Sequence, residues 1–243
     1  MELGGKGVGN IVYGGNYNSN QDTIDTFGTV TNNPNLDLTY FVSALDDLRK
    51  KSAYWASLPS NGKSASYQWG WQFSKGNNEC VQVMNVEASK LGGGNWVNFH
   101  SSLSGKTIVI NVVDTGAVTI NRVQDMVDPS GNRGYAFSPA VTKNILWNFP
   151  HATSVTLNGG AEFQGSILVP NGDLIFKHPG HSGRVIVAGD LTQNYGGSEF
   201  HNYQVNISCV LLISLSVLFI IPLTTLDHSL TQFALFHCQS ATI

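Results

Sequence analysis

Charged residues are scarce in this chain. Only 12% of the 243 residues are Asp, Glu, Lys or Arg, and the formal net charge is −3. No stretch gathers Lys and Arg into the basic patch that proteins need to bind a nucleic acid backbone. The composition therefore argues against nucleic-acid binding and against electrostatic docking on a membrane.

Cysteine is rare as well, with three residues that lie far apart in the sequence, at positions 80, 209 and 238. They form no CxxC pair, so neither a disulfide framework nor a zinc site is expected. For Cys80 the surroundings favour a small, buried, apolar side chain. No metal and no cofactor is predicted.

The motifs of common enzymes are missing too. There is no Gly-x-Ser-x-Gly elbow, P-loop or dinucleotide-binding glycine motif. The candidate acids Glu162, Asp173, Asp190 and Glu199 are spread singly over successive turns, where such side chains ordinarily cap backbone amides. A hydrolase acting on polysaccharides needs two carboxylates facing one groove. The chain is therefore predicted to be no enzyme, with no catalytic residues.

Glycine, by contrast, is abundant, with 26 residues, and it separates short apolar runs between residues 145 and 203. These runs predict four short strands: Val155 to Leu157, Ile167 to Val169, Leu174 to Phe176, and Val185 to Ala188. The corners between them are expected at Gly159-Gly160, Pro170-Asn171-Gly172 and Pro179-Gly180.

The same stretch repeats itself at an offset of 19 residues. The offset aligns Val155 with Leu174 and Ile167 with Ile186, two strands per period. Such a unit closes one coil of a β-solenoid, and Ile167 is expected to stack on Ile186 in the next coil. A β-sandwich of hairpins with coincidental spacing remains the alternative.

Five phrases resemble the choice-of-anchor A family of secreted and surface-displayed domains. They are Thr107 to Val112, Ile145 to Ala152, Gly165 to Pro170, Gly183 to Ala188 and Glu199 to Tyr203, in the family's order over residues 4 to 203. A fainter resemblance, through the third and fourth phrases, is to ice-binding β-solenoids with a long helix laid along the coils. The resemblance implies an exported, non-catalytic domain.

One long helix is predicted between Asp37 and Leu58. Its apolar residues follow a spacing of three and four, and Ser52 is the one polar interruption of the stripe. Asn35 or Asp37 can cap its first turn, and Pro59 ends it. The stripe is expected to dock on the coils, while Asp46, Asp47, Arg49 and Lys50 form a solvated face. The stripe comprises Leu38, Phe41, Leu45, Leu48 and Trp55.

The fold class is thus mainly β, a β-solenoid with one long helix alongside, followed by an apolar tail. Residues 1–203 are assigned to the solenoid domain, with residues 7–33 as capping coils, and residues 204–243 to the tail. Residues 202 to 226 are uncharged over 25 positions, which is enough to span a bilayer. A transmembrane anchor and a gene-model artefact both remain open for this tail.

The N-terminus shows no basic start followed by an apolar run, so no signal peptide is visible. Because the resemblance implies export, an upstream segment is expected to be missing. An extracellular or cell-surface location is predicted on this basis, and membrane anchoring through the tail stays one of the two open alternatives.

Trp69 and Trp71 alternate along a predicted strand and share one face. Two flat aromatic rings on one face suit either a platform on which a sugar stacks or a buried contact with the core, and the core contact is favoured. The sequence does not decide between them.

Histidines raise the question of a metal site, because Glu199 and His201 share one strand face. The segment from His178 to His181 is expected to be a corner, and nothing brings His151 to His201. No metal site is assigned. Asn148, between two aromatic residues, is predicted to join an asparagine ladder or to cap a coil.

The predicted function is a non-enzymatic extracellular or cell-surface module with an adhesive or structural role, whose partner is an unidentified protein or glycan surface. The alternatives are a solenoid that binds carbohydrate or ice, and a polysaccharide-active enzyme. Ice binding would need a regular array of Thr or Ser, for which Thr153 and Thr156 are the hints in the sequence.

Overall fold

The computed structural model describes residues 11–13, 29–194, 199–201 and 203. The apolar tail and most of the predicted capping segment, residues 7–33, lie outside these residues. In the described part, two short strands, β1 (Ile11–Tyr13) and β2 (Val30–Asn32), pair in parallel. They correspond to two short apolar runs of the predicted capping segment.

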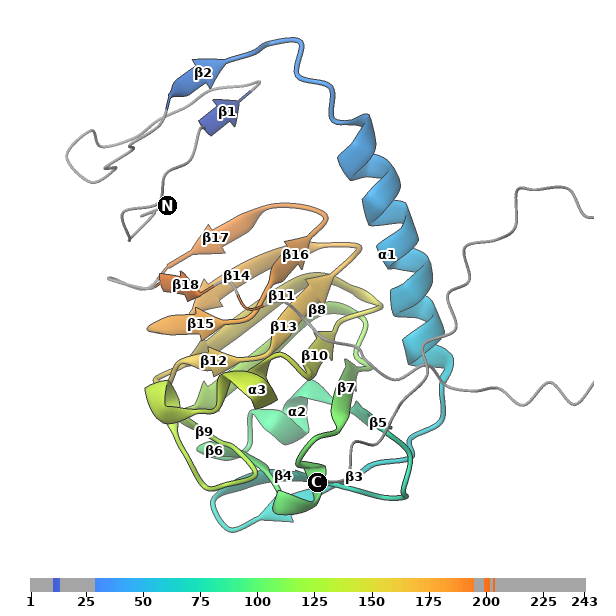
Figure 1. Cartoon of the computed structure of the whole chain (residues 1–243), viewed down its shortest axis with the longest axis vertical. Coiled ribbons are helices and arrows are strands. Elements are labelled where there is room, and N and C mark those ends of the chain that lie inside the picture. Colours follow the sequence, from blue (N-terminus) through green and yellow to red (C-terminus); the bar gives the residue numbers. More distant parts are fainter. Residues whose placement is uncertain (1–10, 14–28, 195–198, 202, 204–243) are drawn as a thin grey trace, which may run out of the picture.

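Most of the strands in the described residues pair in parallel to form β-sheets (Figure 1). One sheet has the order β16-β13-β10-β7-β5, and a second has the order β17-β14-β11-β8. The strands of the first are β5 (Val81–Val86), β7 (Thr107–Val112), β10 (Ile145–Asn148), β13 (Ser166–Val169) and β16 (Val185–Val187). Those of the second are β8 (Gly116–Val123), β11 (Ala152–Gly159), β14 (Asp173–Lys177) and β17 (Leu191–Gln193). The prediction of a mainly β chain is confirmed.

Two further sheets complete the β structure. One is parallel, in the order β12-β15-β18, and the other has the order β3-β4-β6-β9 with one antiparallel pair, β3 and β4. Their strands are β12 (Phe163–Gln164), β15 (Gly180–Ser182), β18 (Glu199–His201), β3 (Lys63–Tyr67), β4 (Gly70–Ser74), β6 (Trp96–Phe99) and β9 (Asp125–Val127). From β10 to β18 the chain visits three sheets in the same order three times. Each round adds one strand to each sheet.

The register confirms the predicted repeat on one sheet and corrects it on another. Val155 pairs with Leu174, as the offset of 19 predicts. Ile186, however, pairs with Leu168, and Ile167 with Val185, so the offset there is 18. The predicted stacking of Ile167 on Ile186 is therefore wrong. A one-residue shift moves a side chain to the other face of a strand, and Ile186 packs outside with Leu168 while Ile167 lies in the interior.

The corner predicted at Pro179-Gly180 is confirmed in part: the chain bends at His178 and Pro179 between β14 and β15, whereas Gly180 is already the first residue of β15. Two other glycines mark further sharp turns of the chain. Gly165 precedes β13 with φ of 102°, and Gly183 precedes β16 with φ of 147°. This is the left-handed region that glycine adopts without a steric cost, so these two residues set the equivalent corners of adjacent rounds.

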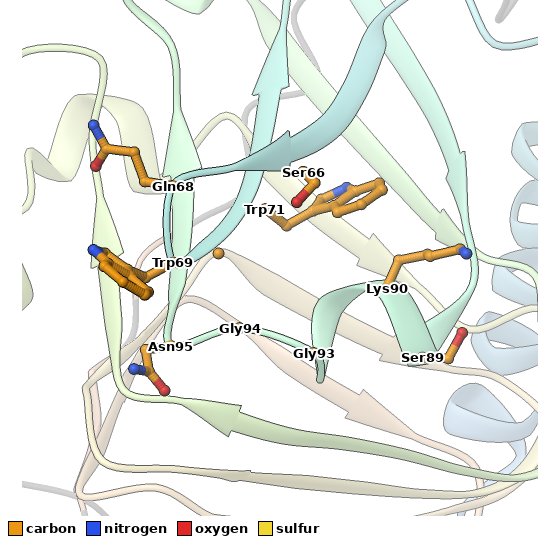
Figure 2. A pocket seen from close by; sticks show the side chains of 10 residues that line it. Ser66, Gln68, Trp69, Trp71, Ser89, Lys90, Gly93, Gly94 and Asn95 are labelled. Carbon is orange, nitrogen blue, oxygen red and sulfur yellow. The ribbon is translucent and has the colours of Figure 1, made fainter.

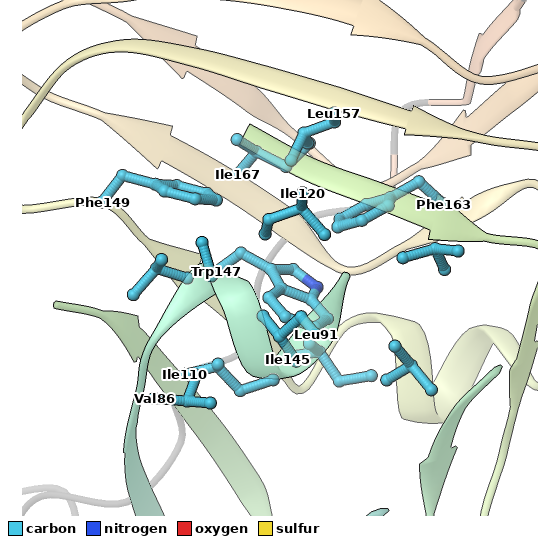
Figure 3. Close-up of a cluster of buried hydrophobic side chains, with 14 of the residues drawn as sticks. Val86, Leu91, Ile110, Ile120, Ile145, Trp147, Phe149, Leu157, Phe163 and Ile167 are labelled. Carbon is cyan, nitrogen blue, oxygen red and sulfur yellow. The ribbon is translucent and has the colours of Figure 1, made fainter. Parts of the chain in front are cut away.

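The interior between the sheets is filled by aliphatic and aromatic side chains (Figure 3). Trp147 lies at its centre, 1% exposed, with its ring 5.1 Å from that of Phe163. Its indole N–H donates to the carbonyl of Gln164 at 2.8 Å, which satisfies the one polar group of the side chain. Burial on this scale supplies the main driving force for folding.

The predicted long helix is present as α1 (Thr39–Ser57), alongside the sheets in Figure 1. Asp37 accepts a hydrogen bond from the backbone N–H of Thr39 at 2.9 Å, near the expected cap. The other helical pieces are short: α2 (Ala88–Leu91), α3 (Pro139–Thr142) and the 3-10 turns η1 (Ser101–Leu103) and η2 (Gly134–Ala136). No helix in the described part of the chain is long and apolar enough to cross a membrane.

The predicted stripe docks on the sheets in the second half of α1 but not in the first half. In the second half, Leu48 and Trp55 pack on an outer cluster of the first sheet that includes Val109 and Leu146. In the first half, Leu38 is 51% and Phe41 65% exposed, so the predicted docking of these two residues is wrong. Arg49 also departs from the predicted solvated face, because its Nε donates to the carbonyl of Pro170 at 3.0 Å.

The polar residue Ser52, rather than an apolar one, is the most deeply buried residue of α1 (1% exposed). Its hydroxyl donates to Oδ1 of Asn148 at 2.5 Å, and Nδ2 of Asn148 donates to the Ser52 carbonyl at 3.0 Å. Asn148 continues to Asn111 at 2.9 Å, and Asn111 to Asn85 at 2.7 Å, on adjacent strands in register. The predicted asparagine ladder is confirmed, and it holds the helix.

Candidate functional site

Three surface features carry side chains that could contact a ligand. The first is a pocket of about 460 Å³ at the turn between β3 and β4 (Figure 2). We call it the Trp69 pocket; its lining residues are Ser66, Gln68, Trp69, Gly70, Trp71, Ser89, Lys90, Gly93, Gly94 and Asn95. Its volume falls in the range of pockets that hold small ligands.

The two tryptophans of the sequence prediction both reach this pocket, but in different ways. Trp71 is half-buried and packs against the core, as favoured from the sequence. Trp69 lies in the turn before β4 rather than on the strand, and it is 73% exposed. The prediction that both rings share one strand face is therefore wrong, since the strand begins only at Gly70.

The second feature is a smaller pocket of about 180 Å³ near the last strand, β18. We call it the His201 pocket; its lining residues are Phe137, Pro139, Thr142, Glu162, Gln164, Ser182, His201 and Tyr203. Glu162 is 4% exposed, so its carboxylate is nearly withdrawn from water. A buried charge is tolerated when it is paired and hydrogen-bonded.

The buried carboxylate of Glu162 is indeed paired. It accepts a short hydrogen bond from the hydroxyl of Ser182 and lies 3.1 Å from Nδ1 of His201. On the other side of the imidazole, Nε2 lies 3.1 Å from a carboxylate oxygen of Glu199. The expectation that Glu162 and Glu199 stay apart is therefore wrong, because Glu162, next to β12, and Glu199, on β18, both reach the imidazole of His201 although β15 lies between the two strands. Of the other two candidates, Asp173 does cap a backbone amide: its Oδ1 accepts a hydrogen bond from the N–H of Asp190, the second one, at 2.8 Å.

The ionisation of His201 follows from this arrangement. Partial burial by itself would lower the pKa of His201, but the hydrogen bonds to Glu199 and Glu162, together with their charges, outweigh it and raise the pKa. A protonated imidazole between two carboxylates is the state that these contacts favour. His201 therefore links the exposed Glu199 on its own strand to the buried Glu162.

The other two histidines of this region are buried and neutral. Burial lowers the pKa of His178 to about 4, against a hydrogen bond to the carbonyl of Ala161. Burial likewise lowers the pKa of His181 to about 4, against a hydrogen bond to the carbonyl of Gly165. Both rings pack against Phe163 and Phe176. They belong to the core, whereas His151 is exposed in the turn before β11.

Metal ligation finds no further support in this region. Within the residues that the structure describes, no group of three or more His, Cys, Asp or Glu side chains is arranged to hold a metal ion. Cys80 is half-buried, so the predicted burial of this side chain is met in part.

The third feature is the outward face of the second sheet. Thr119, Thr156, Ile175 and Thr192 stand side by side on β8, β11, β14 and β17. Adjacent strands are about 4.8 Å apart, so this row has a regular spacing. Thr153 does not belong to it, because the register shifts between Ala152 and Ser154. The sequence could not reveal the row, since its members are 17 to 37 residues apart.

These features define a mainly β protein in which stacked parallel strands carry two pockets and an exposed, regularly spaced row of side chains. The chain belongs to the family described as "Putative Ice-binding-like adhesive domain", whose model matches residues 2–202. The match supports the class of adhesive domains and agrees with the fainter resemblance to ice-binding proteins. The more specific resemblance to the choice-of-anchor A family stays a prediction. No curated protein matches the chain, and no solved structure does.

Proposed function

We propose that the chain is a non-enzymatic adhesive module that acts outside the cell or on its surface. The observation that carries this proposal is the match to an adhesive family over residues 2–202. In this proposal the repeated rounds through three sheets form a β-solenoid. A stack of this kind suits adhesion because each round is hydrogen-bonded to its neighbours, so the support resists deformation.

The His201 pocket brings together a serine, a histidine and two carboxylates, the residue types of a catalytic triad, but their geometry favours a structural role. A Ser-His-acid triad places the nucleophile on one imidazole nitrogen and the acid on the other. Here Ser182 and Glu162 both face Nδ1 of His201, while Nε2 faces Glu199. The serine hydroxyl donates to the carboxylate rather than to the imidazole. In this arrangement the proton of Ser182 is directed at the carboxylate of Glu162 rather than at His201.

Adhesion is tested with the full chain coated on beads, measured as detachment force from surfaces that carry polysaccharide, protein or whole cells. Beads coated with albumin are the control. Attachment above this control to at least one surface is expected. Detachment forces equal to those of the control on all surfaces would overturn the adhesive proposal.

The non-enzymatic part is tested by incubating the full chain with a panel of polysaccharides and measuring new reducing ends. No release above a heat-treated control is expected. Release that disappears in Glu199→Gln, a substitution at an exposed carboxylate, would replace the adhesive proposal with that of a polysaccharide-active enzyme.

The extracellular location is tested by labelling intact and permeabilised cells with an antibody to the chain. Labelling of intact cells is expected. Labelling that requires permeabilisation would contradict the location. The proposed membrane anchor concerns residues 204–243, outside the described residues, and is tested by whether residues 1–203 alone are released into the medium.

A second candidate function is binding to ice, favoured by the row of Thr119, Thr156 and Thr192 on the outward sheet face. Regularly spaced hydroxyl and methyl groups suit an ordered water lattice, although Ile175 interrupts the hydroxyls. Thermal hysteresis of the full chain, reduced in Thr156→Lys and unchanged in Thr153→Lys, is the expected result. Absence of hysteresis in the unsubstituted chain would remove this candidate.

A further inference from the structure

The turn between β3 and β4 holds an exposed tryptophan in an unusual backbone setting. Tyr67 pairs with Gly70, so the loop consists of two residues, Gln68 and Trp69. Gln68 has φ of 49°, and among the described residues it is the one non-glycine with positive φ. Two-residue hairpin loops need this region, and glycine, asparagine or aspartate usually supplies it. Glutamine at this position places a polar side chain in the turn, which glycine would not, but its backbone is strained.

Strain of this kind persists where the surroundings fix the backbone, and it gathers at ligand sites. The surroundings here are well defined. The N–H of Asn95 donates to the carbonyl of Trp69 at 2.6 Å, and β4 pairs with β6 from Gly70 onward. A Cβ on Gly94 would lie 2.4 Å from the Cα of Gly70, so only glycine allows this close approach. The turn is therefore held in place before any ligand arrives.

The opposite wall of the Trp69 pocket is anchored separately. Ser89 and Lys90 lie on the short helix α2, whose first N–H, that of Ala88, donates to the carboxylate of Asp114 at 2.7 Å. Figure 2 shows Gln68, Trp69 and Asn95 on one side of the pocket, and Trp71, Lys90 and Ser89 on the other. Two fixed walls with different side chains thus face one space.

The aromatic residues of this corner differ in what covers their rings. Arg133 lies 4.3 Å from the ring centroid of Trp96, so that ring face is occupied. Trp71 packs against the core, and its indole N–H is buried without a hydrogen-bond partner among the described residues. Trp69 remains 73% exposed. Tyr40 is equally exposed, but Trp69 also lines a pocket, and an exposed aromatic ring at a pocket fits a recognition site better than packing.

The polar side chains around the Trp69 ring indicate which class of ligand the pocket could bind. The lining side chains described above offer two amides (Gln68, Asn95), two hydroxyls (Ser66, Ser89) and one ammonium (Lys90), and no carboxylate. Amides and hydroxyls both donate and accept hydrogen bonds, as the hydroxyls of a sugar do. A pyranose ring presents C–H groups on one face and hydroxyls at its rim. It therefore matches an aromatic face bordered by such polar groups.

We propose that the Trp69 pocket binds a pyranose ring of a polysaccharide. This inference rests on the proposed adhesive function and names the chemical class to which the module adheres. The C–H face of the sugar stacks on Trp69. Gln68 and Asn95 bind hydroxyls at one rim, while Lys90 and Ser89 face the other side of the ring.

The test uses the full chain and a set of immobilised polysaccharides, neutral β-glucans and polygalacturonate among them, with affinity measured for each. Binding to at least one of them is expected. Trp69→Ala should weaken that binding by at least about tenfold, because the stacking surface is lost. Trp69→Phe, which keeps a flat ring, should retain most of the affinity.

Tyr40→Ala is the matched control, since Tyr40 is as exposed as Trp69 (75% against 73%) but lies on α1. It should bind polysaccharide like the unsubstituted chain, and all three variants should unfold at the same temperature. No binding to any polysaccharide, or equal binding by Trp69→Ala, would overturn the inference.

The bead assay separates this inference from the proposed function. Beads carrying Trp69→Ala that still adhere, in the absence of polysaccharide binding by the unsubstituted chain, would leave the adhesive module standing and remove the sugar pocket. Polysaccharide binding that depends on Trp69, without adhesion of any beads, would keep the pocket and remove the adhesive function.

Discussion

The Trp69 pocket and the His201 pocket differ in what their polar side chains contact. Around His201, the charged groups are bonded to one another, Glu162 to Ser182 and His201, and His201 to Glu199. Around Trp69, the lining side chains Ser66, Asn95 and Lys90 are exposed. Groups that already satisfy each other stabilise the fold, whereas groups left facing water are available to a ligand. The difference assigns structure to one pocket and recognition to the other.

The largest effect is expected from acid, acting on the buried histidines beside the His201 pocket. The pKa of His178 and that of His181 are about 4 in the folded chain, against about 6.5 when unfolded. The unfolded state therefore binds more protons below pH 6.5, and stability falls as pH decreases from 6.5 toward 4. By pH 4 the loss should reach roughly 3 kcal/mol per histidine, measured by urea unfolding at several pH values.

His201 acts with the opposite sign, because its pKa is raised. Its contribution is present below about pH 6.5 and is lost as pH rises through the folded pKa, so it partly offsets the acid loss near neutrality. Stability that stays constant between pH 7 and pH 4.5 would contradict the burial of His178 and His181.

A second, smaller loss of stability is expected from Glu162→Leu. The substitution leaves Ser182 and His201 without their buried partner, at an expected loss of about 2 kcal/mol. This value is set below that of a fully buried pair because His201 is 35% exposed and keeps Glu199. Polysaccharide binding by the folded variant should be unchanged. A variant that unfolds like the original but no longer binds would move recognition to the His201 pocket.

The same contrast exists within α1, between Ser52 and Ser43. Ser52→Ala removes the hydrogen bond to the buried Asn148, at an expected loss of about 1–2 kcal/mol in thermal unfolding. Ser43 is exposed and bonds to a carbonyl of its own helix, so Ser43→Ala should change stability by less than about 0.5 kcal/mol. Equal effects would show that the asparagine ladder does not hold the helix.

The smallest effect is expected at Gln68. Substitution there should raise the stability of the fold, whereas the substitutions above lower it. Gln68→Gly relieves the positive φ and should raise stability by about 0.5 kcal/mol while weakening polysaccharide binding. Gln72→Gly, in the interior of β4, should lower stability instead by about 0.5–1 kcal/mol. A loss of stability in Gln68→Gly would show that the glutamine is kept for folding rather than for a ligand.

Local patterns in the sequence predicted the elements well. The strands around Val155, Ile167, Leu174 and Val185 are present, and the helix predicted from Asp37 to Leu58 is found at Thr39–Ser57. Asn148 was assigned to a ladder because a polar residue between buried aromatics needs a partner. Such features follow from side-chain periodicity and backbone preference, which a short window of sequence contains.

The third sheet could not be predicted in this way, because β12, β15 and β18 are two or three residues long. Strands this short have no periodicity of their own. They exist because each pairs with a strand one round away, as Phe163 does with His181. The one-residue change of register at Ile186 has the same origin, since corner length, not strand sequence, sets the offset.

The sequence by itself determined that this chain is glycine-cornered and mainly β, with one amphipathic helix and few charges. Only the tertiary structure decided which polar groups meet: Ser52 with Asn148, Glu162 with His201, and Thr119 with Thr156. It also left Trp69 exposed while burying Trp71 against the core. The reason is physical, since hydrophobic periodicity is encoded locally, whereas contacts between rounds depend on the length of every corner between them.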